Sequence, residues 1–149
     1  MSPKWEHLDR PYFVYGTLRP AWGNSRLWLY NDATAAYDGD AYVPGYQMID
    51  HGIPYAVATG NPDHRVVGCL IVPGDDFDDR ATLRHDLDQL EGWPDHYDRV
   101  QVEVITPDFP VAAWIYTPTT WKVDGPVEPS GDFANCGRGR KLRTGGGWQ

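Results

Sequence analysis

The stretch P-Y-F-V-Y-G-T-L-R, which spans Pro11 to Arg19, begins with aromatic and β-branched residues and changes character at Gly16. Such side chains are typical of a buried strand, so we expect the first strand from Pro11 to Tyr15. Gly16 ends this strand and opens a short polar turn. Successive N–H groups in such a turn can bind an anion, and a glycine lets a ligand approach the backbone closely. The alternative is that Gly16 only permits a tight connection.

Short apolar runs bounded by Pro and Gly follow this strand along the chain. Many strands and few helices in 149 residues predict an α+β fold in a single domain, with one main helix. We expect a small mixed β-barrel or a strongly curved sheet. The runs predict strands at 34–49, 55–58, 66–72, 100–105 and 111–116, and a short helix at 24–30.

The main helix is expected over residues 79–91, because leucines recur there at the spacing of one helical stripe. Either Asp78 or Asp79 can cap its first turn. Gly92 can adopt the left-handed conformation that commonly follows a last turn. The leucines of the stripe are Leu83, Leu87 and Leu90.

Glu91 occupies the last position of this helix. The unpaired carbonyl groups at a helix C-terminus disfavour a negative charge, and apolar neighbours such as Leu90 and Trp93 exclude water from the carboxyl group. We therefore expect Glu91 to be partly buried, with its pKa raised toward the range useful for proton transfer. The alternative is an ordinary solvated glutamate, since eight aspartates lie between residues 75 and 98.

Other reactive side chains carry weaker signals. Asp88 is expected to be a solvated or capping residue. His85 and His96 lack the spacing of a metal site, so no metal is predicted. Cys69 lies in the apolar run V-V-G-C-L-I-V, where burial would suppress its thiolate. A covalent nucleophile is therefore not expected.

Charge is distributed unevenly along the chain. There are 13 basic and 21 acidic residues, a net charge of -8. Four of the basic residues fall in the glycine-rich segment 137–149, so the remainder carries nine basic against 21 acidic residues, or -12. We expect a domain over 1–136 and a flexible basic tail over 137–149. The acidic body disfavours a membrane or nucleic-acid partner, the tail being the only basic element.

The chain shows no sign of export. Its first ten residues lack an apolar run, no stretch is long and apolar enough to span a membrane, and two cysteines are too few for a disulfide framework. These features predict a cytoplasmic protein in which Cys69 and Cys136 are reduced.

Several motifs, taken in order and spacing, resemble those of the gamma-glutamylcyclotransferase-like family over residues 12–116. The pattern Y-G-T-L-R with Asn24 downstream is similar to the gamma-glutamylamine branch of that family. The motifs are Y-G-T-L-R-P at 15–20, P-G-Y at 44–46, I-P-Y-A-V at 53–57, V-x-G-x-L at 66–70, L-D-x-L-E-G at 87–92 and Y-D-R-V at 97–100.

The resemblance implies a reaction that needs no cofactor. In it the α-amine of a small gamma-glutamyl substrate attacks its own γ-carbonyl, forming 5-oxoproline and expelling an amine. Glu91 would be the general base and acid. The residues leave open a non-catalytic module that binds a carboxylate on the same fold. Substrate contacts are expected from Tyr15, Gly16, Thr17, Leu18 and Arg19, and from Tyr97 and Arg99. For Tyr97 and Arg99 the alternative is a role in packing and a salt bridge.

Overall fold

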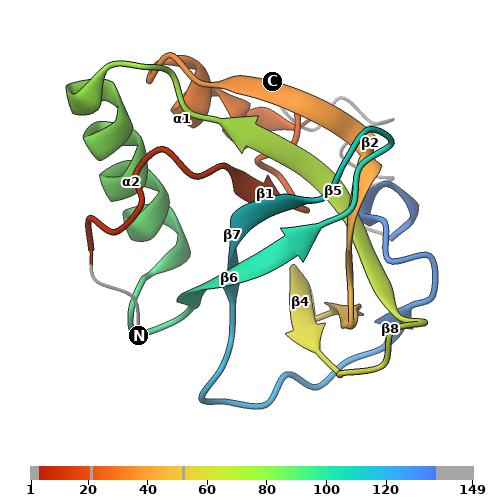
Figure 1. The fold of residues 1–149 in the computed structure, drawn as a ribbon. Coiled ribbons are helices and arrows are strands. Elements are labelled where there is room, and N and C mark those ends of the chain that lie inside the picture. The colour runs from red at the N-terminus through yellow and green to blue at the C-terminus, as the bar shows by residue number, and fades with distance from the viewer. Residues whose placement is uncertain (1–3, 21, 52, 137–149) are drawn as a thin grey trace.

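The computed structural model describes residues 4–20, 22–51 and 53–136, so the tail expected at 137–149 lies outside the described residues. Two β-sheets and two α-helices make up the fold (Figure 1). In chain order the elements are β1 (Tyr12–Val14), η1 (Gly23–Ser25), α1 (Arg26–Leu29), β2 (Thr34–Pro44), β3 (Tyr46–Asp50), β4 (Pro54–Ala58), β5 (Arg65–Val72), α2 (Phe77–Glu91), β6 (Asp98–Val104), β7 (Val111–Thr117), β8 (Val127–Glu128) and η2 (Phe133–Asn135).

β1 lies in the middle of a five-stranded sheet with the order β2-β5-β1-β7-β6. It runs antiparallel to β5 and parallel to β7, so the sheet is mixed. Tyr12 and Val14 pack into one hydrophobic cluster with α2, whereas Phe13 packs into a second cluster on the opposite face. The prediction of a buried first strand is confirmed, because both faces of β1 are covered.

The five-stranded sheet is curved, and its two edges touch at one point. Tyr42 of β2 and Ile105, just after β6, exchange two backbone hydrogen bonds of 3.0 and 2.8 Å. A bulge in β2 between Ala36 and Ala41 shifts its register against β5, and bulges bend a strand. Because the edges of the described sheet share only this bridge, a closed barrel is not confirmed, whereas the single α+β domain is.

The predicted strand at 34–49 is in fact two strands. Gly45, with a φ of +81°, separates β2 from β3, and β3 then pairs with β4 in the second sheet, whose order is β4-β3-β8. The two residues of β8 carry no sequence pattern and were not predicted. The short helix expected at 24–30 is confirmed as η1 followed by α1.

α2 lies to one side of the five-stranded sheet, and the N-terminal segment passes across it (Figure 1). The helix begins two residues earlier than predicted, and its cap is Asp76, whose carboxylate accepts a 3.0 Å hydrogen bond from the N–H of Asp79. At the other end Gly92 has a φ of +70°, which a side chain would disfavour. Both ends of α2 are therefore set by local chemistry.

The buried stripe of α2 differs from the predicted one. Leu83 and Leu87 are fully buried, but Leu90 is 46% exposed. Arg84 and Asp88 are buried instead, at 0% and 1% exposure. These polar side chains can occupy the helix face toward the sheet because groups on the sheet and the N-terminal segment form hydrogen bonds and ion pairs with them.

Candidate active site

A cavity of about 230 Å³ opens where β1 ends. Its wall is formed by the turn after β1, the start of β4 and the end of α2. The residue just before β6 and one residue of β7 complete it. These elements are far apart in sequence, and the sheet brings them together. The lining residues are Phe13, Val14, Tyr15, Gly16, Thr17, Leu18, Asn24, Ile53, Pro54, Leu90, Glu91, Tyr97 and Tyr116.

The turn after β1 is held in place by Asn24, which also lines the cavity. The side-chain amide of Asn24 donates to the hydroxyl oxygen of Thr17 at 2.7 Å, and the Asn24 N–H donates to the Thr17 carbonyl at 3.1 Å. In the part of the chain that the structure describes, the N–H groups of Gly16, Thr17 and Leu18 donate to no protein acceptor. This turn therefore presents unpaired backbone donors beside the cavity, which suits an anion.

Glu91 lines the cavity from the last turn of α2. Its carboxyl group is partly buried and forms no hydrogen bond or ion pair with any described residue. Burial raises the pKa of Glu91 from 4.5 to about 7. The predicted burial and direction of the pKa are confirmed, and loss of water around the carboxyl group is the cause.

Tyr15 and Tyr97 lie close to Glu91. The Tyr15 hydroxyl donates to the carbonyl of Tyr116 at 2.9 Å. Burial raises the pKa of both phenols, and the negative charge of Glu91 raises each further. Both side chains are therefore neutral walls of the cavity that can form hydrogen bonds but carry no charge.

Arg19 does not reach the cavity, although it follows the turn directly. Its guanidinium group donates to Asp38 and Asp132, each at 2.8 Å, and lies over the ring of Trp22. Its side chain is 4% exposed. Arg19 thus joins the turn after β1 to β2 and to the segment before η2, rather than contacting a ligand.

Arg99 does not line the cavity either. It is fully buried, and its Nη1 donates to Oδ1 of Asp88 at 2.6 Å. Its guanidinium group also lies 4.5 Å from the ring centre of Trp93. Of the two expectations for Arg99, the structure therefore shows packing and a salt bridge rather than a position in the cavity wall.

The surroundings of Asp88 correct the expectation of a solvated residue. Besides Arg99, the Tyr116 hydroxyl donates to its Oδ1 at 2.5 Å, and Nζ of Lys4 lies 3.0 Å from its Oδ2. These partners come from β6, β7 and the N-terminal segment, which only tertiary folding brings together.

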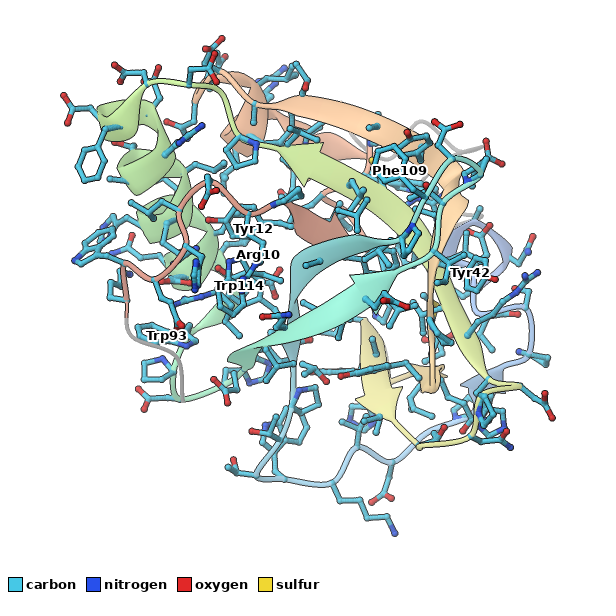
Figure 2. All side chains as sticks on the ribbon, in the orientation of Figure 1. Arg10, Tyr12, Tyr42, Trp93, Phe109 and Trp114 are labelled. Carbon is cyan, nitrogen blue, oxygen red and sulfur yellow. The ribbon has the colours of Figure 1, made fainter. Side chains whose placement is uncertain are left out.

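Arg84 extends this buried polar network on the same face of α2. It donates to the Tyr12 hydroxyl at 2.7 Å and to the Lys4 carbonyl at 2.8 Å. Figure 2 shows Tyr12, Arg10 and Trp114 gathered between α2 and the sheet, with Trp93 below them. The network anchors the helix behind the cavity.

Some lining residues were not predicted as site residues. Ile53 and Pro54 belong to the motif I-P-Y-A-V, which contributed to the resemblance but carries no reactive group. Tyr116 lies inside a predicted strand, where nothing in the pattern marks it. The motif at 53–57 and Asn24, which follows the Y-G-T-L-R motif, were the signals that could have located part of this wall.

Metal binding and thiol chemistry would depend on other side chains of the described ranges. There, no group of three or more His, Cys, Asp or Glu side chains is placed to hold a metal ion. Burial raises the pKa of Cys69 to about 12, as its apolar run predicted. No helix in this part of the chain is long and apolar enough to cross a membrane.

The fold is thus a curved mixed sheet in which the carboxyl group at the end of α2 and the turn after the central strand line one cavity. The family model described as gamma-glutamyl cyclotransferase, AIG2-like, matches residues 12–135. Because this match covers most of the sequence, the chain belongs to that family. The resemblance therefore extends beyond residue 116.

Solved structures share the fold. An AIG2-like protein from Mus musculus is 24% identical over 87% of this chain and 92% of its own, with a TM-score of 0.66. YkqA from Bacillus subtilis is 21% identical over 83% of this chain and 39% of its own, with a TM-score of 0.60. An uncharacterised protein from Pyrococcus horikoshii is 24% identical over 84% and 90%, with a TM-score of 0.54. No curated protein matches.

Proposed function

We propose that the protein is a gamma-glutamylamine cyclotransferase, which converts a gamma-glutamyl amine into 5-oxoproline and a free amine without a cofactor. One observation carries the proposal. The unpaired carboxyl group of Glu91, with a pKa of about 7, lies in the same cavity as the unpaired N–H groups of Gly16, Thr17 and Leu18. The first can move a proton and the second can hold an anion.

The substrate is held folded on itself. Its α-carboxylate, or the oxyanion that forms on its γ-carbonyl, accepts hydrogen bonds from the turn after β1. Such binding brings the α-amine within reach of the γ-carbonyl, so the entropy of approach is lost on binding rather than in the reaction. The cavity of about 230 Å³ has room for one gamma-glutamyl group.

Glu91 moves two protons in turn. Its carboxylate takes a proton from the α-ammonium group, and the amine nitrogen so released forms a bond to the γ-carbon. The γ-carbonyl oxygen becomes an oxyanion, and the attacking nitrogen, which still carries two hydrogens, becomes positively charged. As the carbonyl reforms, the carboxylic acid of Glu91 gives its proton to the amide nitrogen, and the bond between that nitrogen and the γ-carbon breaks. The carboxylate then takes the extra proton from the ring nitrogen and passes it to the departing amine, which leaves as an ammonium ion. No water is consumed, and Glu91 returns to its starting state.

The pKa of Glu91 fits both halves of this cycle. A group that titrates near pH 7 is present as a base and, once protonated, is still acidic enough to donate. An ordinary exposed glutamate would be a weak base at this pH. The burial that raises the pKa thus favours the reaction.

The other predicted residues divide into two groups in this proposal. Tyr15, Gly16, Thr17, Leu18 and Tyr97 contact the substrate. Arg19 and Arg99 do not contact the substrate but hold the surrounding segments in position, since their guanidinium groups bind aspartates outside the cavity.

The test is to incubate the purified protein with a panel of gamma-glutamyl amines and peptides and to follow 5-oxoproline by mass spectrometry. We expect turnover of at least one gamma-glutamyl amine. Glu91→Gln keeps the shape of the side chain but cannot carry the proton, so kcat should fall by about 10²- to 10⁴-fold. Glu103→Gln is the matched control, because Glu103 is exposed on β6 and forms no ion pair with a described residue.

Two results would contradict the proposal. Normal turnover by Glu91→Gln would remove the mechanism. Binding of gamma-glutamyl amines in calorimetry without 5-oxoproline from any of them would instead identify a carboxylate-binding module.

A further inference from the structure

Four ring-bearing side chains form an aromatic rim beside the cavity: Tyr55, His96, Tyr97 and Trp121. Tyr55 is central, with its ring centre 5.7 Å from that of Tyr97 and 5.4 Å from that of Trp121. The His96 ring lies 4.5 Å from Tyr97 and 5.2 Å from Trp121. The rim joins β4, the segment before β6 and the segment joining β7 to β8, which passes below β4 in Figure 1.

The aromatic rim continues the wall of the cavity. Tyr97 belongs to both, and Ile53 and Pro54, which line the cavity, directly precede Tyr55. Leu90, also in the lining, is 46% exposed beside Glu91. From Glu91 toward the rim the wall is therefore apolar.

The rim remains accessible on its outer side. Trp121 is 37% exposed and His96 is exposed, whereas Tyr55 and Tyr97 are buried beneath them. The indole N–H of Trp121 already donates to the His96 carbonyl at 2.8 Å. That bond fixes the indole ring, and what the ring offers a ligand is an apolar surface.

Charge narrows the choice of ligand. Glu91 is the single charged residue among those that line the cavity, and the reaction already occupies it. A second ammonium group on the leaving amine would find no other carboxylate among the residues that line the cavity. A flat apolar group would instead gain favourable aromatic contacts with the rim.

We propose that the aromatic rim binds the leaving amine of the substrate and that this amine is an arylalkylamine, whose ring packs against Trp121 and His96 while its nitrogen remains at Glu91. The inference rests on the proposed function. The amide bond that breaks and the protons that move are those already described, and the amine leaves as an ammonium ion.

The experiment compares three substrates that differ only beyond the amide nitrogen: gamma-glutamyl benzylamide, gamma-glutamyl methylamide and ε-(gamma-glutamyl)lysine. Formation of 5-oxoproline gives kcat and KM for each. We expect kcat/KM for the benzylamide to exceed the other two by about tenfold, mainly through a lower KM.

Variants of Trp121 test whether the preference for the benzylamide arises at the aromatic rim. In Trp121→Ala the ratio of kcat/KM for benzylamide over methylamide should fall about three- to tenfold, and Trp121→Phe should restore most of it. Phe109→Ala is the control, because Phe109 is also an exposed aromatic residue, at 60%, but lies in the segment that joins β6 to β7 and does not line the cavity. It should leave the ratio unchanged.

The outcomes separate the two proposals. If no substrate yields 5-oxoproline, the proposed function fails and this inference fails with it. If the methylamide or the lysine conjugate is turned over as well as the benzylamide, the proposed function stands and the arylalkylamine is wrong. If Trp121→Ala lowered kcat/KM equally for all three substrates, the rim would serve only to hold the segment that joins β7 to β8, and the arylalkylamine would be wrong.

Discussion

Asp88 and Glu91 are carboxyl groups one helical turn apart near the end of α2, and their surroundings are opposite in character. Asp88 is 1% exposed and contacts Arg99, Tyr116 and Lys4. Glu91 forms no hydrogen bond or ion pair with a described residue and lines a cavity. The same chemical group on the same helix is thus bound on one side and left available on the other.

The difference follows from where each position faces. Asp88 faces the sheet and the N-terminal segment, which supply cations and a phenol. Its backbone carbonyl also accepts a hydrogen bond from the Trp93 N–H at 2.9 Å. Asp88 therefore fixes the end of the helix through both its side chain and its backbone. Glu91 faces the end of β1, where apolar side chains exclude water but provide no partner. In the proposed reaction, the firmly held Asp88 fixes the end of the helix that carries Glu91.

Removing Asp88 should have the largest effect. Asp88→Ala leaves Arg99 buried without its carboxylate, and breaking a buried ion pair costs about 3 to 5 kcal/mol. Urea unfolding followed by tryptophan fluorescence should show that loss in the free energy of unfolding. Asp95→Ala is the control, because Asp95 is exposed and has no partner among the described residues. Similar stability of both variants would mean that Asp88 does not anchor α2.

The pH dependence of activity should report Glu91 alone. Since the carboxylate is the active form and its pKa is about 7, kcat/KM should fall about tenfold per pH unit below pH 7, or about 100-fold at pH 5. Steady-state assays between pH 5 and 9 measure this limb. A limb near pH 4.5 would show that Glu91 behaves as a solvated carboxyl group, so the contrast with Asp88 would disappear.

The stability of Glu91→Gln should change in the opposite direction from that of Asp88→Ala. The pKa of Glu91 rises from 4.5 to about 7 on folding, so the folded state binds more protons between those values. Wild-type stability therefore falls as pH rises through this window, and the loss is complete above pH 7.

Because glutamine does not ionise, Glu91→Gln should be more stable than the wild type by about 1 to 2 kcal/mol at pH 8.5, where solvent at the partly exposed carboxylate limits the difference. Near pH 4 the two proteins should be equally stable. Thermal unfolding at both pH values measures the difference, with Glu103→Gln as the reference. A variant less stable than the wild type at pH 8.5 would show that the ionised carboxylate has a partner after all.

The smallest effect is expected from Tyr116→Phe. It removes one hydrogen bond to Asp88 but leaves both cations in place, so the free energy of unfolding should fall by about 1 kcal/mol. Urea unfolding again provides the measurement. A loss as large as that of Asp88→Ala would show that the phenol, rather than the ion pairs, holds the end of α2.

Local patterns predicted those parts of the molecule that depend on neighbouring residues. The aromatic run before Gly16 predicted β1, and leucine spacing with Gly92 predicted most of α2 and its end. The position of Glu91 among apolar residues at that end predicted its burial and raised pKa. The motif at 15–18 located the turn that faces Glu91 across the cavity.

Patterns failed where the partner of a residue comes from a distant segment. Leu90 has the spacing of Leu83 and Leu87, but it lies at the cavity and is 46% exposed. Arg19 lies beside the site motif, yet Asp38 and Asp132 draw its guanidinium group away from the cavity. Gly45 divided a continuous β-rich run between two sheets.

The amino-acid sequence by itself determined the α+β class, the family resemblance, the central strand and the candidate proton carrier, because each depends on side-chain periodicity or on residues adjacent in the chain. Only the tertiary structure decided which of two neighbouring carboxyl groups is paired. That choice depends on Lys4, Arg99 and Tyr116, whose distances from Asp88 along the chain carry no information about their distances in space. Burial removes water from both Asp88 and Glu91, and the presence or absence of a partner then decides what each can do.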